Sequence, residues 1–280
     1  MIEDYEDAVR RKLTQSLKAD ASVFLEVLFR PSFHPETLLR AERGASSSRL
    51  HFRSFTTNLW YSEPDNRPEV VEAEFALGTE VARDFWAQLA GLGPQAISPE
   101  EVLGLDGMSV EVAYAGGDEP YQFEVWLPRL NSREGRVVKL LYDLFWSCER
   151  PTVVTDRLEQ LHGYLHYGLP VRKIEGDPVT LRFFASLSYD QETVAELQHL
   201  FSSLADQKAV IVDMTNFDGM GTAYYPVFRE FIAADSELAW VAKDNSRALQ
   251  QAEEMEVEAD RIFDSVSQAR NWFLSDRSNG

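Results

Sequence analysis

The sequence predicts an α+β domain followed by an α/β domain. Roughly the last hundred residues alternate strand and helix patterns, which requires crossover connections and a largely parallel sheet. The preceding residues also contain strand and helix patterns but without strict alternation, which is typical of an antiparallel sheet covered by helices. A length of 280 residues favours two domains over one.

The N-terminal domain is expected to span residues 1–150. Its first helix carries Tyr5, Val9, Leu13 and Leu17 at every fourth position, so these side chains share one face. Helices are expected at 3–18, 35–44, 79–92, 98–103 and 131–148, and strands at 22–30, 50–61, 70–77, 108–114 and 121–127. The side chains of the third helix expected to face the core are Val81, Phe85, Trp86 and Leu89.

A helical connector at 151–170 is expected to separate this domain from a C-terminal domain at 171–280. The C-terminal strands are expected at 171–174, 178–189, 208–214, 237–242 and 261–263, and the helices at 190–207, 222–235, 246–257 and 266–274. The apolar strand expected at 208–214 has Asp213 at its carboxyl end, so residues 216–221 should form the loop to the next helix.

Three features of the C-terminal domain carry a family resemblance. They are the opening hairpin that turns at residues 175–178, the apolar strand ending on Asp213, and the segment 261–269. In this order, over residues 171–274, the chain resembles the STAS domain, the fold of anti-sigma-factor antagonists. The resemblance implies protein binding in a partner-switching pathway.

The resemblance is incomplete at the family's phosphorylation switch. In the family, a Ser or Thr follows an Asp directly at the N-terminus of the third helix. Here Asp218 is followed by Gly219 and Met220, and Thr222 comes two positions later. The candidate ligand or switch-loop residues are therefore Asp213, Asp218 and Thr222, in a pattern that departs from the family's.

Residues 75–145 carry a second resemblance. Leu105, Asp106 and Gly107 form a turn before an alternating hairpin, whose second strand leads through Trp126 to Pro128 and a leucine-rich helix. This order is similar to several small bacterial immunity proteins of polymorphic toxin systems. It implies neutralisation of a toxic enzyme domain by direct binding.

The net charge of −19 argues against nucleic acid as a ligand, because a polyanion would be repelled. The chain's densest acidic segment either is a solvated helix face or forms a contact surface for a cationic protein partner. Its residues are Glu253, Glu254, Glu256, Glu258 and Asp260.

Several features indicate a cytoplasmic protein without a membrane interaction. The first ten residues are acidic and have no apolar segment, so no secretory signal is expected. No run of about 18 apolar residues is present, which predicts no membrane span. The single cysteine, Cys148, cannot form an internal disulfide, which favours a reducing compartment.

No pattern indicates a catalytic site, a metal or a cofactor. Asp213 and Asp218 either bind Mg²⁺ or act as acid and base at a strand end, or else satisfy loop amides and cap a turn. His162 and His166 have the spacing of metal ligands on a helix, but no third ligand is placed nearby. The aromatic residues that alternate in one predicted strand, and that fit a core better than a stacking site, are Phe52, Phe55, Trp60 and Tyr61.

Two functional hypotheses follow, with a third behind them. The first is a non-catalytic immunity protein whose acidity suits a basic toxin domain. The second is a STAS-type regulator with the N-terminal domain as its sensor. The third is an enzyme that uses Asp213 and Asp218.

Overall fold

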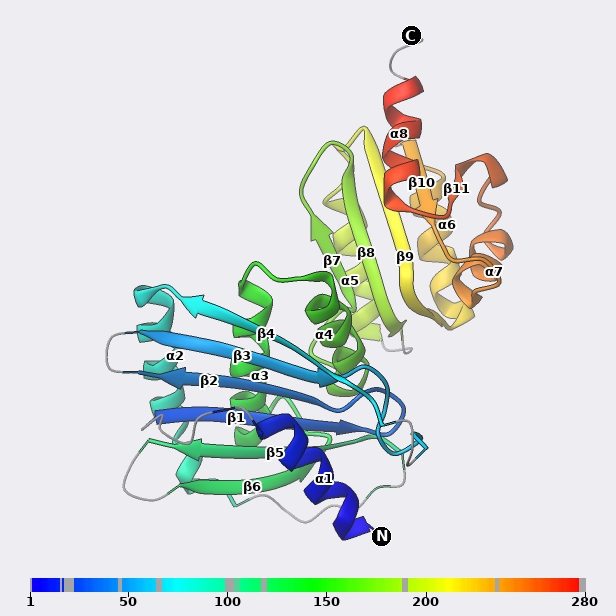
Figure 1. Cartoon of the computed structure of the whole chain (residues 1–280). Helices are drawn as coiled ribbons and strands as arrows, with labels where there is room; N and C mark the ends of the chain where they lie inside the picture. Colours follow the sequence, from blue (N-terminus) through cyan, green and yellow to red (C-terminus); the bar gives the residue numbers. More distant parts are fainter. Residues whose placement is uncertain are drawn as a thin grey trace. The chain divides into compact units, whose positions relative to one another are not determined.

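The computed structural model describes residues 2–15, 17, 23–44, 47–63, 67–98, 104, 106–116, 120–187, 191–234 and 237–276. The chain divides into two compact units, Met1–Leu165 and His166–Gly280. The first unit is built on a six-stranded sheet and the second on a five-stranded sheet (Figure 1).

The first unit is an antiparallel sheet with helices on both faces. Its elements are α1 (Ile2–Thr14), β1 (Val23–Pro31), β2 (Thr37–Arg43), β3 (Ser48–Phe55), β4 (Val70–Leu77), α2 (Thr79–Leu92), η1 (Pro94–Ala96), β5 (Met108–Ala115), β6 (Tyr121–Trp126), α3 (Arg133–Ser147) and α4 (Thr152–Leu165). The strand order is β4-β3-β2-β1-β5-β6, and every neighbouring pair is antiparallel. α1 lies across one face, and α2 and α3 cover the other (Figure 1).

The face covered by α2 and α3 holds the apolar core. Successive residues of a strand point to opposite faces, so Leu25, Val27 and Phe29 of β1 all point to this side, and all three are buried. Phe145 of α3 packs edge-on against Phe75 of β4, with ring centroids 6.1 Å apart. These contacts confirm the predicted antiparallel sheet with helices.

Three predictions in this unit are wrong. The predicted helix at 35–44 is strand β2, which is paired on both sides by β1 and β3. The predicted strand at 50–61 stops at Phe55, so Trp60 and Tyr61 lie in the next loop and are exposed. In α2, Val81 is exposed and Ala82 is buried instead. The helix predicted at 98–103 falls largely outside the described residues.

The second unit is a mixed α/β fold. Its elements are β7 (Val171–Ile174), β8 (Val179–Leu187), α5 (Gln191–Ser202), β9 (Ala209–Met220), η2 (Thr222–Tyr224), α6 (Tyr225–Ile232), β10 (Glu237–Val241), α7 (Arg247–Glu254), η3 (Ala259–Arg261), β11 (Ile262–Phe263) and α8 (Val266–Asp276). The strand order is β11-β10-β9-β8-β7. β7 and β8 form an antiparallel hairpin, whereas β8, β9, β10 and β11 are parallel. The predicted hairpin and parallel sheet are therefore present.

Helices cover both faces of this sheet. The larger apolar cluster joins the sheet to α5, α6 and α7, and it includes Phe183, Phe201, Phe228 and Trp240. The smaller cluster lies on the other face, where Ala269 and Phe273 of α8 pack on Ile211 and Val241.

The central strand β9 is longer than the sequence predicts. It continues to Met220 instead of ending at Asp213, because β8 runs beside it through two register shifts. Ala185 of β8 lies at the second shift and has a positive φ of 51°. Such irregularities let strands continue through residues that otherwise favour turns, here Asn216, Asp218 and Gly219. The expected loop at 216–221 is consequently mostly strand.

A buried carboxylate joins two loops at one end of the first sheet. Glu36, after β1, is fully buried, and its carboxylate accepts hydrogen bonds from the Tyr5 hydroxyl (2.5 Å) and the Leu59 amide (3.0 Å). Asn58 donates from its side-chain amide to the carbonyls of Pro31 and His34, at 3.1 and 2.7 Å. The loop after β3 is thereby fixed to the loop after β1.

Burial raises the pKa of Glu36 above its ordinary value, although the bonds from Tyr5 and Leu59 act in the opposite direction. The folded protein therefore retains a proton on Glu36 at pH values where the unfolded chain has released it. This group's contribution to stability is largest below its ordinary pKa and is lost as pH rises through the folded-state pKa. As pH rises from the ordinary pKa of a glutamate to the folded-state pKa of Glu36, we expect the unfolding free energy of Glu36→Gln to fall less than that of the wild type.

Chemical denaturation between about pH 4 and pH 8 measures this difference. Glu63→Gln is the matched control, because Glu63 is exposed in the same loop region. Equal pH slopes in the wild type and Glu36→Gln would show that Glu36 is not the group responsible.

Candidate functional site

One face of the first sheet carries charged side chains in cross-strand register. Glu26 of β1 is paired with Arg40 of β2, Arg40 with His51 of β3, and His51 with Glu74 of β4. Residues in register point to the same side of a sheet, so these four side chains form a row across four strands. The row lies on the face opposite the apolar core.

Arg40 is the buried cation of this row. Its Nη1 lies 3.1 Å from Glu26 Oε2, and both residues are more than nine-tenths buried. Its Nε lies 3.6 Å from a carboxylate oxygen of Glu42. Removing one partner of such a buried pair leaves a charge uncompensated, which is strongly destabilising.

His51 lies between two carboxylates. Its Nε2 is 3.0 Å from Glu42 Oε1, and its Nδ1 is 3.7 Å from Glu74 Oε2. Glu74 also accepts a hydrogen bond of 2.8 Å from Arg49 Nη1. Each carboxylate beside His51 therefore also has an arginine partner, Arg40 or Arg49.

Helix α1 covers one end of the same face. Its Val9 and Leu13 join Leu28, Leu38 and Phe55 in an apolar cluster. Two ion pairs between described residues also join α1 to the sheet. Glu6 pairs with Arg30 at 3.2 Å, and Arg10 pairs with Glu111.

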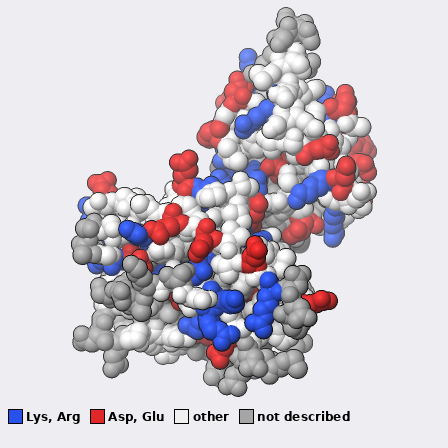
Figure 2. All heavy atoms as spheres, in the orientation of Figure 1, with Lys and Arg blue, Asp and Glu red and all other residues white. Residues whose placement is uncertain are grey.

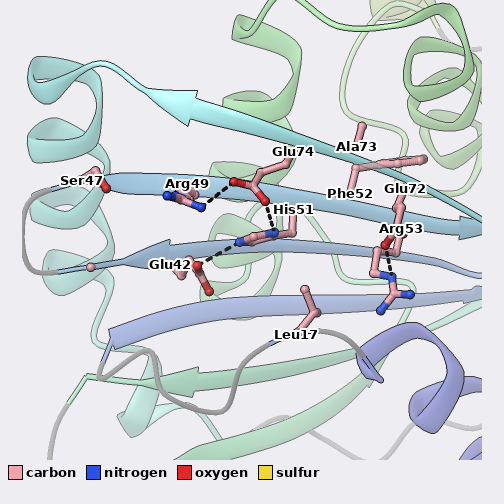
Figure 3. A pocket seen from close by; sticks show the side chains of 11 residues that line it. Leu17, Glu42, Ser47, Arg49, His51, Phe52, Arg53, Glu72, Ala73 and Glu74 are labelled. Atoms are coloured by element: carbon pink, nitrogen blue, oxygen red, sulfur yellow. Dashed lines mark hydrogen bonds and ion pairs between the residues drawn. The ribbon is translucent and has the colours of Figure 1, made fainter.

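The same face holds a cavity of about 640 Å³ over β2, β3 and β4 (Figure 3). The charged residues that line it are Glu42, Arg49, His51, Arg53, Glu72 and Glu74. This volume is in the usual range of small-molecule sites. We define these six residues as the charged cavity.

The local sequence patterns do not predict the charged cavity. A signal was present, because Arg49, His51 and Arg53 alternate with Leu50 and Phe52 along one strand. Their partners lie on β2 and β4, and no local pattern gives the register between separate strands.

In the second unit, Asp213 is buried in the middle of β9 and not at a strand end. Its Oδ1 accepts a hydrogen bond of 3.0 Å from the Thr215 amide, and its Oδ2 is 3.7 Å from Arg182 Nη1. Asp218 is exposed further along the strand. The structure therefore does not bring the two aspartates together as an acid–base or metal pair.

The end of β9 is held by a buried glutamine. Gln251 of α7 accepts a hydrogen bond of 3.0 Å from the Met220 amide and donates one of 2.7 Å to the Met220 carbonyl. Gly219 has a φ of 128°, and an added Cβ there would lie 2.8 Å from Arg247 Cδ. Glycine therefore permits α7 to approach the strand this closely.

After β9 ends at Met220, Gly221 leads to Thr222, the first residue of η2, and η2 leads into α6. Thr222 and its neighbours Gly221 and Ala223 are exposed. The third helix of the resemblance thus begins at an accessible threonine, but Asp218 belongs to the strand and not to the helix terminus.

The five acidic residues of the predicted contact surface are all exposed, along the end of α7 and through η3. Two of them have internal partners. Glu254 Oε2 accepts a hydrogen bond from the Tyr225 hydroxyl, and Glu258 pairs with Arg261 at 2.8 Å. Figure 2 shows acidic side chains spread over the visible face of this unit with basic side chains among them.

The remaining candidates do not form a site. α4 ends at Leu165, and His166 follows with a φ of 51°, so His162 and His166 do not share a helical face. Within the described parts of the chain, no group of three His, Cys, Asp or Glu residues is placed to hold a metal ion. Cys148 is half-buried, and burial raises the pKa of its thiol.

Comparison with known proteins gives weak likenesses to solved structures alone. No family model and no curated protein matches the chain. Among solved structures, an anti-sigma factor antagonist from Mycobacterium paratuberculosis aligns with 36% of this chain and 90% of its own, at 9% identity and a TM-score of 0.31. A TM-score this low establishes no shared fold. The resemblance to immunity proteins finds no support in these comparisons.

Across the described residues, no helix is both long and apolar enough to cross a membrane.

We expect Gln251→Leu to lower the unfolding free energy by about 2–4 kcal/mol, because it leaves two buried backbone groups of Met220 without partners. Denaturant titration measures the change. Gln250→Leu, at the exposed neighbouring position, is the control and should shift stability by less than about 0.5 kcal/mol. Equal effects of both variants would contradict the role assigned to Gln251.

Proposed function

We propose that this protein is a non-catalytic regulator that binds a protein partner through a STAS-type C-terminal unit. The observation that carries the proposal is the strand order of the second sheet. An antiparallel hairpin at the edge leads into three further parallel strands in chain order, with helices between them. This is the arrangement that the sequence resemblance implies.

The exposed start of α6 supports the same proposal. Thr222 is accessible at the first turn after the central strand. A phosphate there would lie near the N-terminal end of a helix, where negative charge is favoured. The shift of Asp218 into the strand separates this position from the family's switch pattern.

Affinity capture of the tagged full-length protein from its native host at low salt, read by mass spectrometry, tests the proposal. We expect a stoichiometric kinase or sigma-factor regulator. If a kinase is captured, intact-mass analysis with Thr222→Ala as control shows whether Thr222 takes a phosphate. A partner carrying a toxin domain would favour the immunity hypothesis instead, and capture of no protein would contradict both.

Charge reversal at the acidic surface tests where a cationic partner docks. We expect the double variant Glu253→Lys/Glu256→Lys to slow association about tenfold at low salt and much less at high salt, since exposed charges are screened. The control, Glu196→Lys/Asp206→Lys, makes the same change in net charge at exposed positions on and after α5. Stopped-flow or surface-based kinetics with the captured partner measures both. Equal slowing would mean that only net charge matters, and no slowing would place the contact elsewhere.

A further inference from the structure

Arg53 is the least satisfied cation of the charged cavity. It is 7% exposed, and its nearest acidic partner is Glu72, with Nε 3.4 Å from Oε2. Neither Nε nor Nη1 has a hydrogen-bond partner with good geometry among the described residues. Buried charged donors in native proteins are normally hydrogen-bonded, so these two nitrogens of Arg53 are unsatisfied donors within the described residues.

The other basic side chains of the cavity already lie beside carboxylates. Arg49 donates to Glu74, and His51 lies between Glu42 and Glu74. At Arg53, unlike at Arg49, an incoming anion would not have to displace a carboxylate from a described hydrogen bond. The Nη1 atom of Arg53 is shielded in the present arrangement. If the guanidinium turned toward the cavity, no described hydrogen bond would be broken, but the 3.4 Å ion pair with Glu72 would be disturbed.

The surrounding charge restricts the kind of anion. Three carboxylates, Glu42, Glu72 and Glu74, line the cavity beside the two arginines. They repel a multiply charged phosphate and attract a positive group on the ligand. Glu72 is in register with Arg53, and Glu74 is the next residue on the same face, about 7 Å along β4. A carboxylate at Arg53 and an ammonium group near Glu72 and Glu74 fit this spacing.

We propose that the charged cavity binds a small zwitterion of the free α-amino acid class, with its carboxylate on Arg53 and its ammonium group on the β4 carboxylates. A planar carboxylate matches the fork of the guanidinium donors. The site lies wholly in the first unit and is independent of the partner proposed for the second.

Calorimetric titration of the full-length protein tests the proposal with glycine, leucine, glutamate and lysine. Acetate, methylammonium chloride and inorganic phosphate serve as partial ligands. We expect at least one amino acid to bind about tenfold or more tightly than any partial ligand, because only it makes both charged contacts. Failure of all four amino acids to bind, or phosphate binding as tightly as they do, would overturn the proposal.

Variants separate the two ends of the ligand. Arg53→Gln should weaken amino-acid binding about tenfold or more, whereas Arg83→Gln, exposed on α2 beside Asp84, should leave it unchanged. Glu72→Gln should weaken binding of the amino acid but not of acetate. Glu72 is largely exposed, so this variant should fold normally. Unchanged amino-acid affinity in Arg53→Gln, or equal losses for amino acid and acetate in Glu72→Gln, would contradict the assignment.

Discussion

The register of the antiparallel sheet fixes both the core and the charged cavity of the first unit. Residues of a strand alternate between two faces, so a slip of one position exchanges the faces. Such a slip of β3 would turn Arg49, His51 and Arg53 toward α2 and α3 and bring Leu50 and Phe52 onto the face that carries the cavity. Burial of apolar residues and pairing of opposite charges therefore select the same register.

Burying charged side chains on this face costs desolvation free energy. Arg40 and Glu26 are both buried, and their mutual contact, Glu42 and the Phe24 ring beneath Arg40 offset part of their desolvation. Apolar residues of similar size often stabilise a fold as well as a buried ion pair does. α1 supplies an apolar cover over one part of this face, whereas the cavity beside it is lined by charged side chains. Arg53 stands out among these side chains, because the acidic partner that it has within the described residues is a largely exposed glutamate.

Local sequence patterns determine how much of the structure can be predicted. The hairpin of β5 and β6 follows from alternation within each strand, and most C-terminal elements follow from their apolar periods. The local pattern of β2 indicates a helix because Pro35 and Gly44 resemble helix boundaries, whereas pairing with strands on both sides decides its conformation. The local pattern of β9 predicts too short a strand because Asp218 and Gly219 favour turns, and the bulged partner strand that extends it comes from a separate segment of the sequence. The charged cavity is not predictable for the same reason: its residues come from three strands whose register no local pattern reveals.

Because β9 extends to Met220, the backbone that leads to Thr222 is strand and not loop, which matters for partner binding. A loop between Asp213 and Thr222 would have to be ordered when a partner binds, and ordering costs free energy. Here Met220 is held by Gln251 through both backbone groups, and Arg247 packs closely at Gly219. The backbone that leads to Thr222 is therefore fixed before any partner arrives. A protein that docks at the start of α6 would meet a preformed surface, so its affinity would depend on side-chain contacts there and not on folding of the segment.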